Sequence, residues 1–164
     1  LPKNISTDVS STEVVLKHAE KVLSLAKRYE YVVYLSACEP LRPPGTLSSL
    51  LDQMLKDKDS PDTIFYGRPT HRHFWSLTPD LSERPIMNWM SDYTPRQKSV
   101  NQLLLESTGY GLITRPEYWA NGIRFGGKCS WRPIPESIPD LDIHSLNDIN
   151  LLENILKLNP NLVT

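Results

Sequence analysis

The chain alternates between segments with helical periodicity and short runs of β-branched and aromatic residues, and this alternation restricts the folds open to it. Ser10 lies three residues before Glu13, which is typical of a capping box, and apolar residues then recur with helical spacing through residues 14–26. The run Tyr31–Leu35 predicts a strand buried on both faces, as the strands of parallel sheets are. We therefore predict a three-layer α/β fold around a mainly parallel sheet.

The same alternation continues to the end of the chain. Further predicted elements are a helix capped by Thr46 and running to Leu55, strands at Thr63–Tyr66, Gln102–Leu105, Tyr110–Thr114 and Cys129–Ile134, a short helix opening at Thr114–Glu117, and a helix at Leu146–Leu156 capped by Ser145. The stretch 67–102 loses this periodicity and is rich in Pro, His, Trp and Arg. Loops of this length are usually functional or contact a partner, so we expect one of these roles here.

Composition narrows the classes of protein. A chain of 164 residues fits one domain with its own core, and its formal net charge of -1 gives no basic excess for nucleic-acid binding. No apolar stretch approaches the roughly 18 residues of a membrane span, and the start of the chain does not resemble a signal peptide, so we expect a cytoplasmic protein. Cys38 and Cys129 lack ligand spacing, which predicts reduced core thiols.

Two carboxylates near the C-terminus form the clearest candidate for a metal site. Asp140 and Asp142 are spaced i and i+2, so on an extended backbone both side chains point the same way. Proteins typically hold Mg²⁺ through one or two carboxylates together with substrate phosphates. The alternative is a polar loop before a capped helix, because Asp is common in such turns.

Four stretches, taken in order, resemble the acylneuraminate (CMP-sialic acid) cytidylyltransferases and their relatives that act on other keto-acid sugars. Thr7–Thr12 is similar to the family's Ser-Asp-x-x-Ser-Ser segment, and Tyr34–Arg42 to its strand ending in Gln-Pro-Thr-Ser-Pro-Leu-Arg. Pro95–Gln97 with Gly109–Thr114 resembles the Arg-Gln and Asn-Gly-Ala-Ile-Tyr-Ile segments. The last stretch, Arg124–Lys128 with Pro139–Ile143, resembles the Gly-Gly-Lys strand and the Asp-Ile-Asp metal segment.

The resemblance implies a Rossmann-like nucleotidyltransferase fold and transfer of CMP from CTP to an acidic keto sugar, with Mg²⁺ and release of pyrophosphate. It also implies a homodimer in which an irregular arm at about 75–109 contributes to the interface. The implied catalytic and metal residues are Asp140 and Asp142, the substrate-binding residues are Arg96, Gln97 and Phe125, and the nucleotide-binding residues are Ser11 and Arg42. Other readings are a surface ion pair for Arg96 and a loop cap for Arg42.

The chain also departs from the family pattern. It has no Gly- and Arg-rich phosphate loop, so the resemblance covers the family's middle and C-terminal part, and we expect an N-terminally truncated version of the fold. Glu39 stands where the family has a small hydroxyl residue, and its charge would repel a triphosphate. The alternative function is a non-catalytic relative or fragment with a role in binding or assembly.

Overall fold

A computed structural model of the protein describes residues 2–7, 9–56, 61–70, 72, 74–77, 83–85 and 103–162. Its helices are α1 (Thr12–Leu23), α2 (Leu25–Arg28), α3 (Thr46–Lys56), α4 (Pro116–Ala120) and α5 (Leu146–Leu158), with single 3-10 turns at Lys3–Ile5 and Pro160–Leu162. Its strands are β1 (Val32–Tyr34), β2 (Thr63–Thr70), β3 (Trp75–Leu77), β4 (Glu83–Pro85), β5 (Leu103–Glu106), β6 (Leu112–Thr114) and β7 (Cys129–Pro133). The α/β alternation predicted from the sequence is confirmed.

The main sheet has the strand order β1-β6-β2-β5, and β7 also pairs with β2. Both β1 and β2 run antiparallel to β6, while β7 runs parallel to β2. It follows that β1, β2 and β7 share one direction and that β6 is reversed between two of them. The mainly parallel character is therefore confirmed, but the reversal of β6 is a feature that the sequence did not indicate.

β1 is the end strand of this sheet, pairing with β6 from Val32 to Tyr34. Val32 is buried, whereas Val33 is 45% exposed and Leu35 is 41% exposed. The prediction of a strand buried on both faces is therefore wrong among the described residues. A run of β-branched residues reports strand propensity, but the position of the strand within the sheet decides how much of it is covered.

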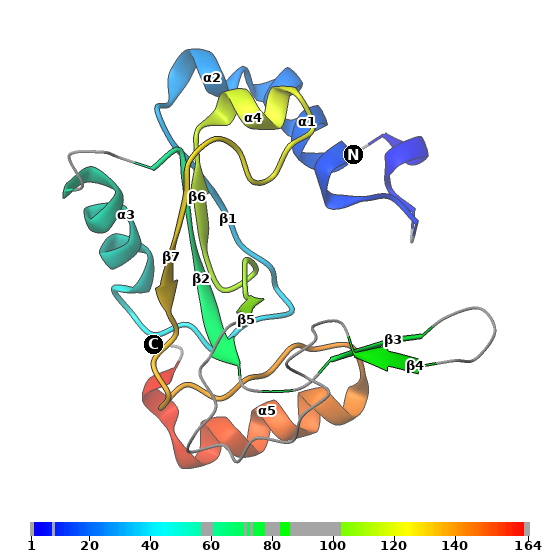
Figure 1. Ribbon diagram of the computed structural model, residues 1–164, viewed down its shortest axis with the longest axis vertical. Helices are drawn as coiled ribbons and strands as arrows, with labels where there is room; N and C mark the ends of the chain where they lie inside the picture. The colour runs from blue at the N-terminus through cyan, green and yellow to red at the C-terminus, as the bar shows by residue number, and fades with distance from the viewer. Residues whose placement is uncertain are drawn as a thin grey trace. The chain divides into compact units, whose positions relative to one another are not determined.

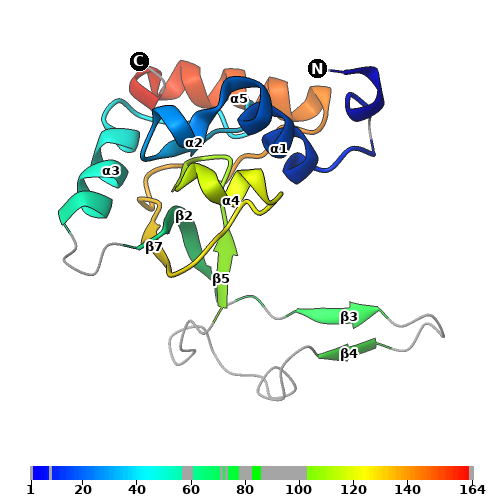
Figure 2. The same cartoon turned by 90° about the horizontal axis from the view of Figure 1, so that it is seen from above.

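Helices cover both faces of the sheet. On one face, Leu50 and Met54 of α3 pack with Ile64 and Ile113 in the larger core, to which α5 adds partly buried residues. On the other face, Leu16 of α1 and Trp119 of α4 pack on Val32. The two views agree in placing α1, α2 and α4 side by side and α3 apart from them (Figures 1 and 2).

The helix caps follow the sequence closely at the C-terminus and less closely at the N-terminus. The Ser145 hydroxyl accepts from the Asp148 N–H, and the Asp148 carboxylate accepts from the Ser145 N–H, which makes the predicted capping box. At α1 the cap is Ser11 instead of Ser10, because the Ser11 hydroxyl accepts from Val14 N–H. α1 also ends earlier than predicted, at Leu23, because the next residue, Ser24, has a left-handed φ of 52°.

The chain divides into two compact units. The first comprises Leu1–Gly67 and Glu106–Thr164. The second is Arg68–Leu105, whose described part includes the antiparallel pair of β3 and β4. The role of an arm at about 75–109 in dimerisation or substrate binding stays a prediction. Cys38 and Cys129 are free, but Cys129 is exposed, so its placement in the core was wrong.

Within the described ranges, every helix is too short or too polar to cross a lipid bilayer.

Candidate functional site

The Asp-x-Asp segment lies against the loop that follows β1. The backbone N–H of Ile143 donates to the carbonyl of Cys38 at 2.8 Å, which fixes the segment beside Glu39. This loop leaves the carboxyl end of β1, and residues 134–143 leave the carboxyl end of β7. Because β1 and β7 run in the same direction, both segments emerge at the same edge of the sheet. In open α/β sheets this edge is where ligands bind.

Glu39 and Asp142 place two carboxylates close together at this edge. Partial burial raises the pKa of Glu39, and the negative charge of Asp142 raises this pKa further. Backbone hydrogen bonds from Gly109 and Tyr110 and the charge of Arg42 act in the opposite direction. Asp142 itself lies 2.8 Å from the Nε2 of His144. We call Glu39, Asp142 and His144 the Glu39 cluster.

Position 109 requires a glycine because the backbone there passes very close to the Glu39 cluster. A Cβ at position 109 would overlap the Glu39 carboxylate and lie 2.6 Å from the Cβ of Ser36. The backbone of Ser36 also donates to the Gly109 carbonyl at 2.9 Å. The glycine therefore lets the turn before β6 approach the loop after β1, and this approach brings donors from one segment to the carboxylate of the other.

Arg42 joins the same two segments through its guanidinium. Its Nε donates to the Tyr110 carbonyl at 2.7 Å, and its Nη2 donates to the carbonyls of Gly109 and Glu39 at 2.9 and 3.0 Å. A longer contact of 3.4 Å reaches the Ser36 carbonyl. These bonds support the alternative reading of Arg42 as a residue that ties its own loop, and nucleotide binding by Arg42 stays a prediction.

A second group of charged residues lies around Arg124, and we call Glu13, Glu106, Thr108 and Arg124 the Arg124 cluster. The guanidinium of Arg124 contacts Glu106 Oε1 at 3.1 Å, Glu13 Oε1 at 3.5 Å and the Thr108 hydroxyl at 3.3 Å. Thr108 also donates to Glu106 Oε1 at 3.0 Å. The cluster joins the first turn of α1 to the end of β5. Thr108 directly precedes Gly109, which contacts Glu39. The Arg124 cluster and the Glu39 cluster are therefore adjacent along the backbone.

Phe125 and Ser11 lie next to the Arg124 cluster. Phe125 packs edge-to-face on Phe65, with ring centroids 5.1 Å apart, and the Arg124 guanidinium lies 5.3 Å from the Phe125 centroid. Ser11 is exposed and uses its hydroxyl to cap α1, two residues before Glu13. The predicted roles of Phe125 in sugar binding and of Ser11 in nucleotide binding stay predictions.

Three predicted site residues remain, and the structure describes only one of them. Asp140 is exposed in the segment between β7 and α5. Arg96 and Gln97 lie outside the described residues. Among the residues that the structure describes, no three His, Cys, Asp or Glu side chains come close enough to hold a metal ion by themselves. The donors present fit Mg²⁺ only in its usual nucleotide-bound form, in which phosphate oxygens complete the coordination.

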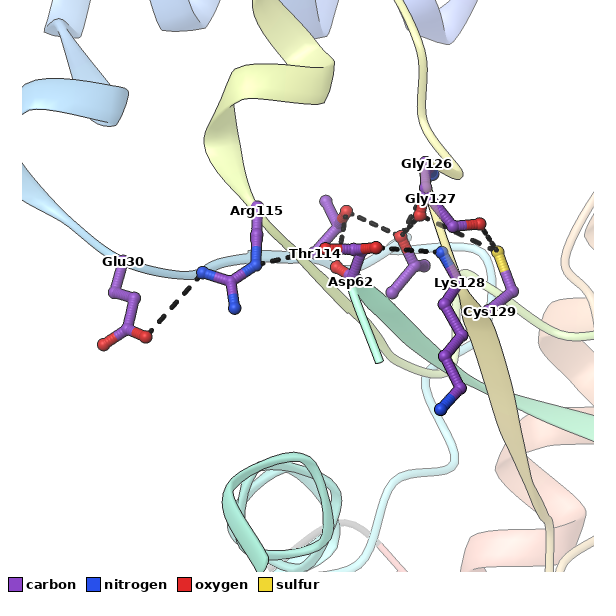
Figure 3. A network of polar contacts seen from close by, with 9 residues as sticks. Glu30, Asp62, Thr114, Arg115, Gly126, Gly127, Lys128 and Cys129 are labelled. Carbon is purple, nitrogen blue, oxygen red and sulfur yellow. Dashed lines mark hydrogen bonds and ion pairs between the residues drawn. The ribbon is translucent and has the colours of Figure 1, made fainter. Parts of the chain in front are cut away.

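A polar network at the opposite end of β2 holds the loop that carries Arg124 and Phe125 (Figure 3). The buried Thr63 hydroxyl lies 2.8 Å from the Thr114 hydroxyl, 2.8 Å from the Gly126 carbonyl and 3.0 Å from the Gly126 nitrogen. The Asp62 carboxylate accepts from Lys128 N–H at 2.9 Å.

The Asp62 carboxylate also lies 3.3 Å from the Nε of Arg115, and the guanidinium of Arg115 lies 3.8 Å from the Glu30 carboxylate (Figure 3). Asp62 therefore pairs both with the backbone after the Gly-Gly turn and with a residue that follows β6. We assign this network a structural role, because every member is paired with another part of the fold.

Sequence reasoning missed several residues of this edge. The motif Arg124–Lys128 gives Arg124 no role of its own, and for Glu39 the sequence indicates only repulsion of a triphosphate. Glu13, Glu106 and Thr108 carried no signal of their own. The position of Arg124 directly before Phe125 could have identified it, since an arginine beside a residue predicted to bind substrate is a candidate anion ligand.

Solved structures share this fold. The crystal structure of 4-diphosphocytidyl-2C-methyl-D-erythritol synthase from Anaerococcus prevotii DSM 20548 superposes with a TM-score of 0.53 at 9% sequence identity. The similarity covers 90% of this chain and 67% of that one. No family model matches the chain, and no curated protein matches it in sequence. At this level of identity the comparison establishes the architecture alone, and we conclude that the chain shares the fold of that synthase.

Proposed function

We propose that the protein is a cytidylyltransferase that transfers CMP from CTP to an acidic keto-acid sugar and releases pyrophosphate. The observation that carries the proposal is the fold shared with a synthase named for its diphosphocytidyl product. The order of motifs that resembles the acylneuraminate cytidylyltransferases supports an acidic sugar as the acceptor. The location of the Asp-x-Asp segment, at the edge where open α/β sheets bind ligands, also supports the proposal.

In the proposed reaction the anomeric hydroxyl oxygen of the sugar attacks the α-phosphorus of CTP. The bond from the α-phosphorus to the oxygen that bridges to the β-phosphate breaks, pyrophosphate leaves, and the hydroxyl proton is lost. Such a transfer depends mainly on positioning and charge neutralisation. Bound Mg²⁺ would supply that neutralisation with Asp140 and Asp142 as its protein ligands. His144 positions the Asp142 carboxylate through their 2.8 Å contact.

The remaining roles follow from the same proposal. Ser11 and Arg42 serve the nucleotide, with Arg42 holding the loop that carries Glu39. Arg96 and Gln97 bind the sugar and its carboxylate, because a guanidinium matches a planar anion. Phe125 presents an apolar surface to the sugar substituent.

Electrostatics set a condition on this function. Among the described residues of the site, Arg124 pairs with Glu13 and Glu106, and Arg42 acts on the Glu39 carboxylate, which also lies near Asp142. The four carboxylates outnumber the two arginines. Such a surface favours a divalent cation and disfavours a free triphosphate. The proposal therefore requires that CTP binds as its Mg²⁺ complex. We also propose that a homodimer forms through the arm at about 75–109.

Calorimetric titration of the natural full-length protein with CTP, with and without Mg²⁺, tests the function. We expect CTP binding that requires Mg²⁺ and is lost in Asp142→Asn, which removes a carboxylate without changing side-chain volume. Asp52→Asn is the matched control, because Asp52 is an exposed carboxylate of α3 that pairs only loosely with Lys56.

No binding of CTP at millimolar concentration would contradict the enzyme proposal and favour the non-catalytic relative. Full Mg²⁺-dependent turnover in Asp142→Asn would remove the metal assignment alone. The sugar is then identified by measuring pyrophosphate release with candidate keto-acid sugars, and equal rates with neutral sugars would argue against an acidic substrate.

A further inference from the structure

We propose that a cavity between α3 and the end of β7 is a second binding site, which takes a small organic anion with a flat apolar body. The cavity has a volume of about 620 Å³ and is lined by residues 43–46, by residues of α3, β2 and β7, and by Tyr110 and Pro135. Cavities of about 300–1,000 Å³ are typical of small-molecule sites. All of its lining belongs to the first compact unit.

Prolines stiffen the walls of the cavity, which also include the polar side chains of Thr46, Ser49 and Gln53. Pro43 and Pro44 line it on one side, and Pro133 and Pro135 line it on another. Proline rings have fixed backbone angles and little conformational freedom to lose. A cavity formed by such residues is largely preorganised, which reduces the entropy that a ligand must offset on binding.

Two aromatic rings add flat apolar surface to the lining. Tyr66 and Tyr110 pack edge-to-face with centroids 5.1 Å apart, and both residues are buried. The Tyr66 hydroxyl donates to the Thr46 carbonyl at 2.9 Å, so the ring is held in place by α3. A flat ligand body would find the ring surfaces already oriented.

The charge of the cavity comes from one residue. Among the described residues that line it, Arg132 of β7 is the single charged one, and none is a carboxylate. Its guanidinium makes no hydrogen bond and no ion pair with any residue that the structure describes, and its charge acts on the Tyr66 phenol. A partly buried guanidinium without such a partner favours a carboxylate or phosphate, which it can bind through two parallel hydrogen bonds.

This cavity differs in chemistry from the site at the Glu39 and Arg124 clusters. None of the members of those clusters lines it. Its lining is positive, whereas carboxylates predominate in the clusters, so a simple anion needs no metal ion to bind here. The inference therefore does not depend on the proposed transferase activity.

Ligand-observed NMR titration of the wild-type protein with benzoate, phenyl phosphate and neutral benzamide tests the proposal, with backbone amide shifts to locate the site. We expect at least one of the two anions to bind and to shift the backbone amides of Arg132, Ile134 and Glu136, because the intervening prolines have no N–H. Arg132→Gln should weaken this binding about tenfold, which corresponds to about 1.4 kcal/mol. The matched control Arg28→Gln removes the same charge from α2, far from the cavity lining, and should leave the affinity unchanged.

A second variant keeps the test independent of the arginine. Gln53→Phe places a ring at the α3 side of the cavity and should abolish anion binding while leaving the unfolding midpoint near that of the wild type. Equal binding of benzamide and benzoate, unchanged affinity in Arg132→Gln, or no binding at about 10 mM, a concentration that detects even weak sites, would overturn the proposal. Displacement of the anion by CTP with Mg²⁺ would overturn it as well, by placing the anion in the nucleotide site.

Discussion

The Nε of Arg42 donates to the backbone carbonyl of Tyr110 at 2.7 Å and joins two loops that are 68 positions apart in the chain. The same guanidinium donates to the carbonyls of Gly109 and Glu39. A planar fork with several donors can serve three carbonyls at once, which a lysine ammonium cannot do in the same directions. The loop that carries Glu39 is thus held by one side chain.

Arg42→Lys should lower the free energy of unfolding by about 2 kcal/mol, because partly buried carbonyls lose charged donors. Urea unfolding of the variant and the wild type measures this difference. Arg28→Lys is the matched control, because Arg28 is exposed and its guanidinium lies over the neighbouring Tyr29 ring, so the change should alter stability little. An unchanged unfolding midpoint for Arg42→Lys would show that the loop is held by other contacts.

Gly109→Ala should destabilise the protein by about 1–3 kcal/mol, which is typical of overpacking at a tight site. The added Cβ would meet the Glu39 carboxylate and the Cβ of Ser36. Thermal unfolding gives the size of the effect. Gly111→Ala is the comparison, because its Cβ would lie 3.2 Å from Tyr66 and 3.3 Å from Leu47, contacts that a small shift relieves. A milder effect at position 109 than at position 111 would contradict the predicted clash.

The stability of the protein should depend on pH through Glu39. Partial burial, and secondly Asp142, raise its pKa above the ordinary value of 4.5, so the native state binds this proton more tightly than the unfolded state does. The stabilisation by the protonated form is complete below pH 4.5 and is lost as the pH rises through the folded-state pKa. Glu39→Gln should therefore stabilise the protein at neutral pH, and its advantage should disappear below pH 4.5.

Urea unfolding of Glu39→Gln and the wild type between pH 4 and pH 8 measures this dependence. Glu136→Gln is the control, because Glu136 is an exposed carboxylate outside the cluster. A constant difference in stability across this pH range would show that the Glu39 carboxylate does not carry the effect.

Thr63→Val should lower the free energy of unfolding by about 2–4 kcal/mol. Valine has nearly the same shape, but the change leaves the buried Thr114 hydroxyl and the Gly126 backbone groups without this partner. Urea unfolding measures the loss, and Thr70→Val, at the partly exposed end of β2, is the control. If Thr63→Val and Thr70→Val have equal effects, the network does not hold the Gly-Gly turn in the way described.

The parts of the fold that the sequence predicted correctly depend on neighbours along the chain. The capping box of Ser145 and Asp148 involves residues three apart, and the structure confirms it. Pro116 at the start of α4 is a local signal of the same kind. Caps and propensities act over a few residues, so a linear pattern contains enough information to predict them.

Strand direction and burial were harder to predict. The reversal of β6 and the edge position of β1 depend on which strands pair, and pairing is set by packing across the sheet. The Tyr31–Leu35 run therefore identified a strand, while the exposure of Val33 and Leu35 followed from the missing neighbour on one side among the described strands.

The amino-acid pattern was sufficient to place Asp140 and Asp142 in an exposed segment between a strand and a capped helix, and to predict an α/β fold. The tertiary structure added that Glu39 lies near Asp142, that Arg42 ties two distant loops, and that Arg132 lines a cavity together with four prolines. Each of these relationships joins atoms from segments far apart in the chain. Their approach depends on how the sheet and helices pack, and local sequence preferences do not encode that packing.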